Sequence, residues 1–168
     1  MTTPRTQPTG GEAEDRQRPY VVVAGLGNEY RRDDGAGPVA AARIAGRTPA
    51  HDVGPVVDPL DLLGRWDTAD LAIVIDAVRS GSPPGTVHVL ELPEGNTGPG
   101  VTSTHGISLA GVLRLAQAVG RAPARVIVVG IEGADFSDGS GLSPAVDGAL
   151  PGAVRQAVEL IEEVYTCA

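Results

Sequence analysis

The sequence predicts a three-layer α/β sandwich in which a twisted, mostly parallel sheet carries helices on both faces. Short β-branched apolar runs recur along the chain, and alanine-rich or amphipathic segments of helical length separate them. Clusters of glycine and proline mark the ends of both kinds of segment. Buried parallel strands read as continuous apolar runs, so this alternation favours the α/β class.

The strands are predicted from apolar content and periodicity. Residues 20–26, 70–76 and 125–131 are continuous apolar runs, which is typical of strands buried on both faces. Residues 86–92 alternate between apolar and polar side chains and form a further strand. Residues 51–57 give a weaker strand signal.

The helices are predicted from their end signals. Pro38 is tolerated because it falls in a first helical turn. Asp58 caps a short helix whose first position is Pro59, and Gly120 ends a later, amphipathic one. The predicted helices cover residues 35–46, 58–65, 107–118 and 142–165.

Bulk properties narrow the class of protein. The chain of 168 residues suits one domain over 19–168, after a polar and disordered N-terminal tail at 1–18. It lacks an apolar run long enough to span a membrane, so we expect no membrane association. Cys167 is the one cysteine, which suits a reducing cytoplasm. We also expect a monomer.

Charge and motifs exclude several chemistries. The net charge of -8 argues against a nucleic-acid partner. The absence of lysine excludes a P-loop lysine, a Schiff base and a Ser-Lys dyad. The stretch "GLGNEY" has Tyr30 where a dinucleotide-binding turn needs its third glycine, so no nucleotide cofactor is expected.

Three polar side chains are predicted to meet at one edge of the sheet. Asp34 follows the first strand, Asp76 closes the strand "AIVID", and His105 lies in a long loop that leads into a helix. Ligands collect at the carboxyl ends of the strands in such sheets. Two carboxylates and one imidazole suit Zn, Ni, Mn or Fe and leave coordination positions open for substrate or water.

Each of these residues also has a structural interpretation. Asp33 or Asp34 is suited to capping the following helix, and we expect Asp33 to do so. Asp76 alone is compatible with a turn at a strand end, and His105 alone with a surface position. His88 lies inside a strand and is expected to be structural.

Five segments in order resemble the hydrogenase maturation proteases. They are "GLGNEYRRDDGAGPVAAARI", "LAIVIDAVRSGSPPGTVHVLE", "STHGISLAGVLRLAQ", "VIVVGIEG" and "GLSPAV". The opening is also similar to that of peptidyl-tRNA hydrolases, but "RRDDG" stands where a catalytic histidine is needed. The resemblance to the maturation proteases implies a twisted sheet between helices, of the phosphorylase/hydrolase-like kind.

The resemblance implies an endopeptidase that removes the C-terminal extension of a nickel-iron hydrogenase large subunit. It implies that Asp34, Asp76 and His105 contact a divalent metal, nickel supplied by the substrate. It selects Asp34 rather than Asp33 from the adjacent pair. Asp34 and Asp76 are the catalytic candidates, acting through a metal or as an acid-base pair that activates water.

One segment departs from the family pattern. The family's glycine-rich turn after the second strand is not recognisable at Gly54 to Val57. An alternative function is therefore a non-cleaving paralogue that binds metal or a hydrogenase maturation partner.

Overall fold

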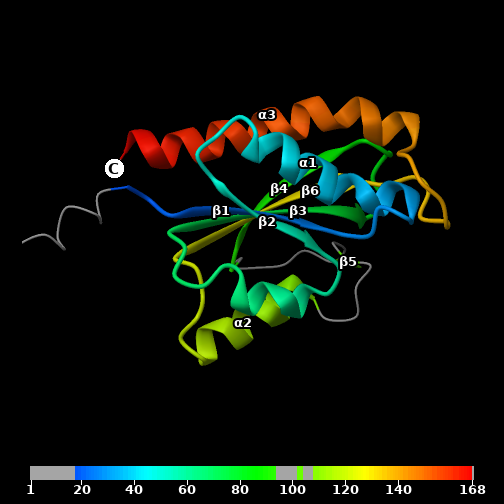
Figure 1. Cartoon of the computed structure of the whole chain (residues 1–168). Coiled ribbons are helices and arrows are strands. Elements are labelled where there is room, and N and C mark those ends of the chain that lie inside the picture. The colour runs from blue at the N-terminus through cyan, green and yellow to red at the C-terminus, as the bar shows by residue number, and fades with distance from the viewer. Residues whose placement is uncertain (1–17, 94–101, 104–107, 168) are drawn as a thin grey trace, which may run out of the picture.

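A six-stranded sheet forms the centre of the molecule (Figure 1). The computed structural model describes residues 18–93, 102–103 and 108–167. The strands are β1 (Val21–Leu26), β2 (His51–Val56), β3 (Leu71–Arg79), β4 (Val87–Leu92), β5 (Thr102–Ser103) and β6 (Arg125–Glu132). The helices are α1 (Ala36–Ala45), α2 (Leu109–Ala118) and α3 (Pro144–Thr166), with short 3-10 turns η1 (Arg32–Gly35) and η2 (Pro59–Gly64).

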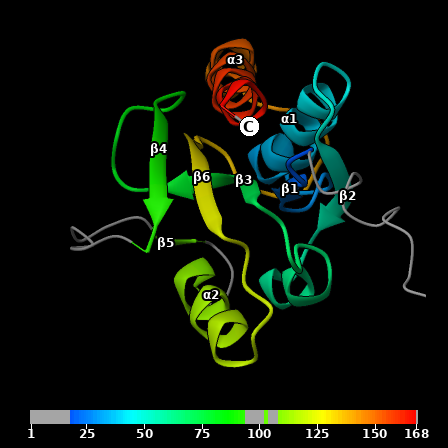
Figure 2. The same ribbon diagram turned by 90° about the vertical axis from the view of Figure 1, so that its left-hand side faces the viewer.

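The strand order is β2-β1-β3-β6-β4, and β5 pairs with β3 outside this path. Neighbouring pairs among β2, β1, β3 and β6 are parallel, whereas β4 is antiparallel to β6 and β5 to β3. Helices α1 and α3 cover one face, and α2 lies on the other with η2 (Figures 1 and 2). The predicted three-layer, mostly parallel sandwich is confirmed.

Alternation along the strands divides the core in two. On β3, Ile73 and Ile75 join the cluster under α1 and α3, while Ala72 and Val74 join the cluster under α2. Trp66 is fully buried in the second cluster. Because both faces are covered, β1 and most of β3 are continuously buried, which explains their unbroken apolar sequences.

Helix α1 packs directly on the backbone of the sheet. A Cβ at Gly37 would collide with the carbonyl oxygen of Leu26 and would lie 2.6 Å from that of Ile75. A Cβ at Gly25 would collide with the carbonyl group of Gly37. These glycines therefore bring the start of α1 against the ends of β1 and β3.

The structure extends two of the predicted strands. β3 continues past Asp76 to Arg79, and β6 includes Glu132, because Val78 pairs with Glu132 beyond the expected ends. The segment with the altered turn is strand rather than turn, since Gly54 lies within β2 at φ 81 beside a break in register with β1. The elements η1 and β5 were not predicted.

Two sequence predictions fall on residues that are not described. The N-terminal tail is outside the described residues except for Arg18. Most of the long loop that holds His105, which the sequence predicts over residues 93–106, is outside them as well. Within the described part of the chain, no helix has the length and apolar character needed to cross a membrane.

Replacing Gly37 with alanine is expected to destabilise the fold. The added methyl group meets two carbonyl oxygens that cannot rotate away, so the free energy of unfolding should fall by about 1–3 kcal/mol. Gly148→Ala is the matched control, because its Cβ meets nothing within 4 Å on α3 and should stabilise by up to about 1 kcal/mol. Urea denaturation measures both, and equal stability of Gly37→Ala and the wild type would contradict this packing.

Candidate active site

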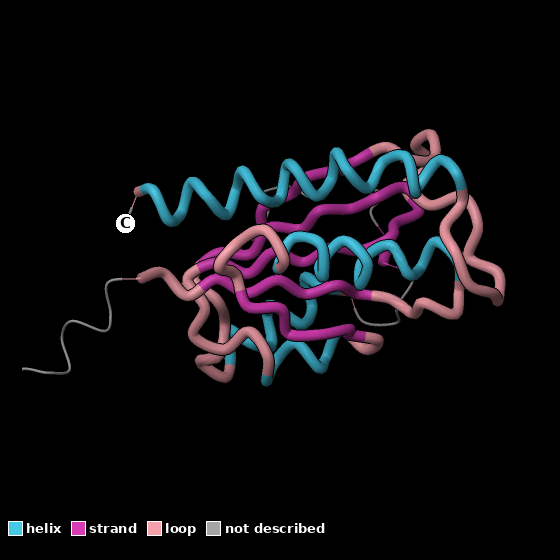
Figure 3. The backbone as a smooth tube through the Cα atoms, turned by 45° about the horizontal axis from the view of Figure 1, so that its top comes forward, coloured by secondary structure: helices cyan, strands magenta, loops and turns pink. Residues whose placement is uncertain are grey.

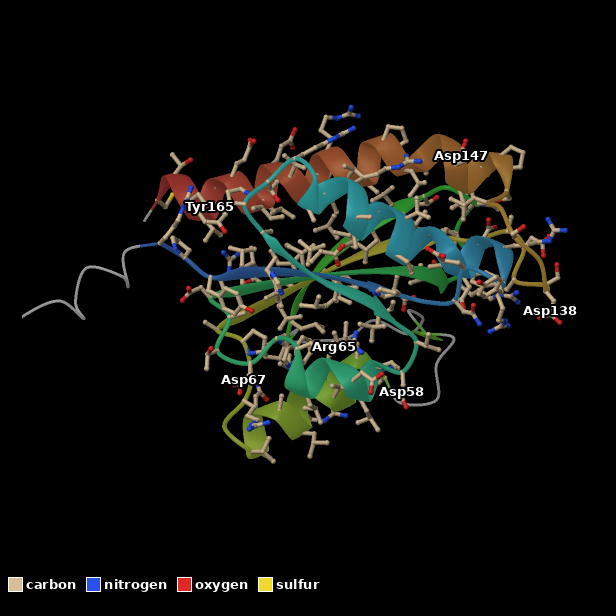
Figure 4. All side chains as sticks on the ribbon, in the orientation of Figure 1. Asp58, Arg65, Asp67, Asp138, Asp147 and Tyr165 are labelled. Carbon is tan, nitrogen blue, oxygen red and sulfur yellow. The ribbon has the colours of Figure 1, made fainter. Side chains whose placement is uncertain are left out.

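Loops at the carboxyl ends of the parallel strands form one end of the molecule, opposite the C-terminus (Figure 3). The first loop, residues 27–35, follows β1, and the second loop, residues 133–143, connects β6 to α3. Asp138 in the second loop and Asp147 in the first turn of α3 mark this end in Figure 4. Four charged side chains among the described residues are fully or nearly buried, and all four lie at this end of the molecule. They are Asp33, Asp34, Asp76 and Glu132.

Asp34 lies in η1 and is fully buried. Its Oδ2 accepts a hydrogen bond from the backbone N–H of Asn28 at 3.0 Å, and Nη1 of Arg31 lies 3.9 Å from the same oxygen. A Cβ at Gly27, where φ is 131, would collide with the carbonyl oxygen of Asp34. The tight turn after β1 thus needs glycine and fixes the backbone that carries this carboxylate.

Asp76 lies inside β3 and is 3% exposed. It is in register with Gly130 on β6, and alternation places it on the face that carries α2. The expectation that Asp76 ends its strand was wrong, since pairing with β5 and β6 carries β3 three residues further. The turn η1, which holds Asp34, contacts β3, so the structure brings Asp34 and Asp76 to the same edge.

His105 lies outside the described residues. The described residue nearest to it in the sequence is Ser103 in β5, which pairs with Val78, two residues beyond Asp76. In the portion of the chain that is described, no group of three His, Cys, Asp or Glu side chains could hold a metal ion. The three-ligand site therefore stays a prediction, of which the structure places the two carboxylates.

Asp33 does not cap the helix that follows it, so this expectation was wrong. Neither η1 nor α1 has a side-chain cap. Its Oδ2 instead accepts hydrogen bonds from the N–H groups of Ala134 and Asp135, both at 2.8 Å, and from Oγ of Ser143 at 2.8 Å. Its Oδ1 accepts from the N–H of Ser143 at 2.6 Å, the residue that precedes α3.

These hydrogen bonds keep Asp33 ionised. Burial by itself raises the pKa of Asp33, because it disfavours the charged form. The hydrogen bonds from Ser143, Asp135 and Ala134 outweigh burial and hold the pKa below its ordinary value. Among the described residues, backbone and hydroxyl donors thus hold the negative charge of Asp33 inside this end of the molecule.

Further backbone hydrogen bonds join the two loops. The N–H of Arg32 donates to the carbonyl of Gly139 at 2.9 Å, and the N–H of Gly139 donates to Tyr30 at 2.8 Å. Nη2 of Arg31 donates to the carbonyl of Phe136 at 3.3 Å. The loop that carries Asp34 is consequently held along its length by the second loop.

A polar cluster that sequence reasoning missed lies where β3, β4 and β6 meet. Oε1 of Glu132 accepts from the N–H groups of Ser80 at 2.8 Å and Gly81 at 3.1 Å. Its Oε2 accepts from Oγ of Ser80 at 2.8 Å and lies 3.4 Å from Nε2 of His88. The available signal was a glutamate directly after the apolar run "VIVVGI".

The cluster is structural rather than a nucleophilic triad. In a triad the two nitrogens of the histidine contact different partners. Here Nε2 of His88 is 3.4 Å from both Oγ of Ser80 and Oε2 of Glu132.

Burial raises the pKa of Glu132, but hydrogen bonds from Ser80, Gly81 and His88 outweigh it and lower that pKa overall. The expectation that His88 is structural agrees with this arrangement.

Comparison with known proteins identifies the family. A family model described as hydrogenase maturation protease matches residues 55–160. The chain belongs to the hydrogenase maturation protease family. Members of this family are endopeptidases. The first and second loops described above thus belong to the fold of a maturation protease.

The relatives of this maturation protease cover most of its length. It is 31% identical over 150 residues to the hydrogenase expression/formation protein HupD of Rhizobium leguminosarum, which covers 85% of this chain and 74% of HupD. It is 27% identical over 151 residues to the hydrogenase 2 maturation protease of Escherichia coli, covering 85% of this chain and 91% of that protein.

Solved structures share its architecture. The [NiFe] hydrogenase maturation protease HybD from Thermococcus kodakarensis superposes with a TM-score of 0.70 at 28% identity, over 84% of this chain and 99% of HybD. The hydrogenase maturating endopeptidase HybD from E. coli has a TM-score of 0.73 at 24% identity, over 86% of this chain and 93% of HybD, and shows the same fold.

Removing the Asp33 carboxylate should cost far more than removing a helix cap. Asp33→Ala leaves buried donors of the second loop without an acceptor, so the free energy of unfolding should fall by at least about 2 kcal/mol. Asp58→Ala is the control, because it removes one cap hydrogen bond, to Leu60, and should cost about 1 kcal/mol. Denaturant titration compares them, and a smaller loss for Asp33→Ala would disprove its anchoring role.

Glu132 should make stability depend on acid pH. Its pKa is lower in the folded state than its ordinary value of 4.5, so its contribution is complete above that value. The contribution is lost as the pH falls through the folded-state pKa. The stability difference between the wild type and Glu132→Gln should therefore shrink between about pH 5 and pH 3. Urea titrations across this range measure it, and a constant difference would contradict the assignment.

Proposed function

We propose that this protein removes the C-terminal extension of a nickel-iron hydrogenase large-subunit precursor after metal insertion, and that it recognises the bound nickel. The observation that carries the proposal is the pair of buried carboxylates, Asp34 and Asp76, at one edge of the fold of a maturation protease. A divalent ion brought by the substrate would be attracted to such a pair.

The ligand set supports nickel supplied by the precursor. Asp34 and Asp76 would contribute oxygen atoms, and we propose His105 as the nitrogen ligand. Oxygen and imidazole donors suit divalent Zn, Ni, Mn and Fe, and three protein ligands leave coordination positions for substrate atoms. Asn28 orients one oxygen of Asp34 through a 3.0 Å hydrogen bond, so the carboxylate is positioned before the substrate arrives.

The proposed chemistry uses the same two carboxylates. A carboxylate next to the scissile peptide can accept a proton from the attacking water and return it to the leaving amine. Nickel held by the precursor polarises the site when it is bound. We expect the protein to work as a cytoplasmic monomer, because its substrate is a precursor that has not yet been assembled.

Substitution of the proposed site residues should abolish processing while the fold survives. Asp34→Asn, Asp76→Asn and His105→Ala should each reduce the rate of processing by about 100-fold or more, the usual loss for a missing acid-base group. Incubation with a nickel-loaded large-subunit precursor, followed by intact mass, measures loss of the C-terminal peptide. His51→Ala is the control, since His51 is exposed at the start of β2.

Three outcomes would overturn parts of this proposal. A stable complex without cleavage by the wild type would favour a non-cleaving paralogue. Equal cleavage of nickel-free and nickel-loaded precursor would disprove recognition of the metal. Normal processing by Asp34→Asn would show that the wrong member of the adjacent pair was chosen.

A further inference from the structure

The two edges of the sheet differ in how they are protected. The edge strand β2 contains Pro55, which has no N–H group, and an irregular register at Gly54. Proline and bulges are the usual devices that prevent an edge from pairing with another strand. The opposite edge strand, β4, has neither, and its six residues pair with β6 in an unbroken register (Figure 2).

The outward backbone groups of β4 can be assigned from the ladder. The N–H of Glu132 donates to the carbonyl of Thr86 at 2.8 Å, which makes this pair a hydrogen-bonded one. In an antiparallel ladder such pairs occur at every second residue. His88, Leu90 and Leu92 therefore bond to β6, while Val87, Val89 and Glu91 direct their N–H and C=O groups outward. No strand among the described residues pairs with that side.

The side chains do not protect this edge either. Val89 is 40% exposed and apolar. Glu91 is the one charged residue of the strand, but Nε and Nη2 of Arg125 on β6 hold its carboxylate at 2.8 and 3.2 Å. Its charge is thus turned toward the sheet and partly neutralised. The outer edge of β4 is a regular template for one more strand.

We propose that the outer edge of β4 binds the C-terminal extension of the hydrogenase large-subunit precursor as an added β-strand. This inference rests on the proposed function, which supplies a peptide that must lie extended at the site to be cut. Strand addition uses backbone groups for affinity, so it suits a segment recognised mainly by conformation.

The distance between the outer edge of β4 and Asp76 suits binding of the C-terminal extension. Asp76, Gly130 and His88 lie in one row across β3, β6 and β4. A strand added to β4 would lie three strand spacings from β3, about 14 Å. About four or five extended residues cover that distance, so a peptide cut beside Asp76 reaches the edge with its next segment.

The start of β4 is held in place for such pairing. His88 contacts the buried Glu132, and Glu132 also binds the turn before β4 through Ser80 and Gly81. The template is therefore ordered before the peptide arrives, and the peptide alone loses conformational freedom.

Val89→Pro tests the edge directly. Proline removes the outward N–H of Val89 but no hydrogen bond to β6, so the sheet should persist. We expect KM for the precursor to rise about tenfold with kcat unchanged, because outward backbone bonding is lost. Val89→Thr keeps the N–H and the β-branched shape and should retain the wild-type KM. Thermal unfolding verifies that both variants are folded.

A peptide measurement keeps the test independent of the variants. A labelled synthetic peptide with the sequence of the extension should bind the wild type, and N-methylation at alternate residues should weaken binding about tenfold in one of the two registers. If Val89→Pro does not fold, this comparison decides the matter. Equal binding of the methylated and unmethylated peptides would overturn the proposal.

The remaining outcomes separate this inference from the function itself. If the wild type cuts the precursor and folded Val89→Pro cuts it with unchanged KM, strand addition is disproved and the function stands. If the wild type binds the peptide in a Val89-dependent way but never cuts, the edge proposal stands and the function fails. Dimerisation that Val89→Pro abolishes, without an effect on peptide binding, would assign the edge to a second copy instead.

Discussion

The hydrogen bonds that Asp33 accepts from the second loop are the interaction on which this end of the molecule depends. Backbone N–H groups from Ala134, Asp135 and Ser143 converge on one fully buried carboxylate. They connect the turn after β1 to the start of α3, two segments more than 100 residues apart in the chain. Without this charge, the donors of the second loop would be buried without acceptors, and the neighbouring Asp34 would lose its support.

Buried carboxylates thus serve two purposes at the same edge. Asp33 and Glu132 are satisfied by backbone and hydroxyl donors, and they fix loops. Asp34 and Asp76 are buried at the same end of the sheet, and we propose them as the carboxylates that meet an ion brought by the substrate. Internal hydrogen bonds hold the charges of Asp33 and Glu132 and make this end of the fold rigid, which is the support that the proposed chemistry of Asp34 and Asp76 requires.

Sequence patterns predicted the architecture well because a strand that is buried on both faces has an unbroken apolar sequence. β1 and β3 are apolar at nearly every position since helices cover both sides, and α1 is rich in small residues because it lies on the backbone of the sheet. The short elements η1 and β5 have no such sequence pattern, because pairing with distant segments rather than local preference creates them. The role of Asp33 was misassigned for the same reason, since its donors come from the second loop.

By itself, the sequence determined the α/β class, the covering of both faces of the sheet, and the gathering of acidic residues at the carboxyl ends of the strands. Periodicity and strand direction are local properties, so the sequence records them directly. Only the tertiary structure decided which carboxylate anchors a loop, that Glu132, Ser80 and His88 form one cluster, and which edge of the sheet is left open to pairing. These features depend on contacts between segments that are distant in the chain. Hydrogen-bond donors become partners of a carboxylate only when the fold has brought them within 3 Å, and no local pattern records that event.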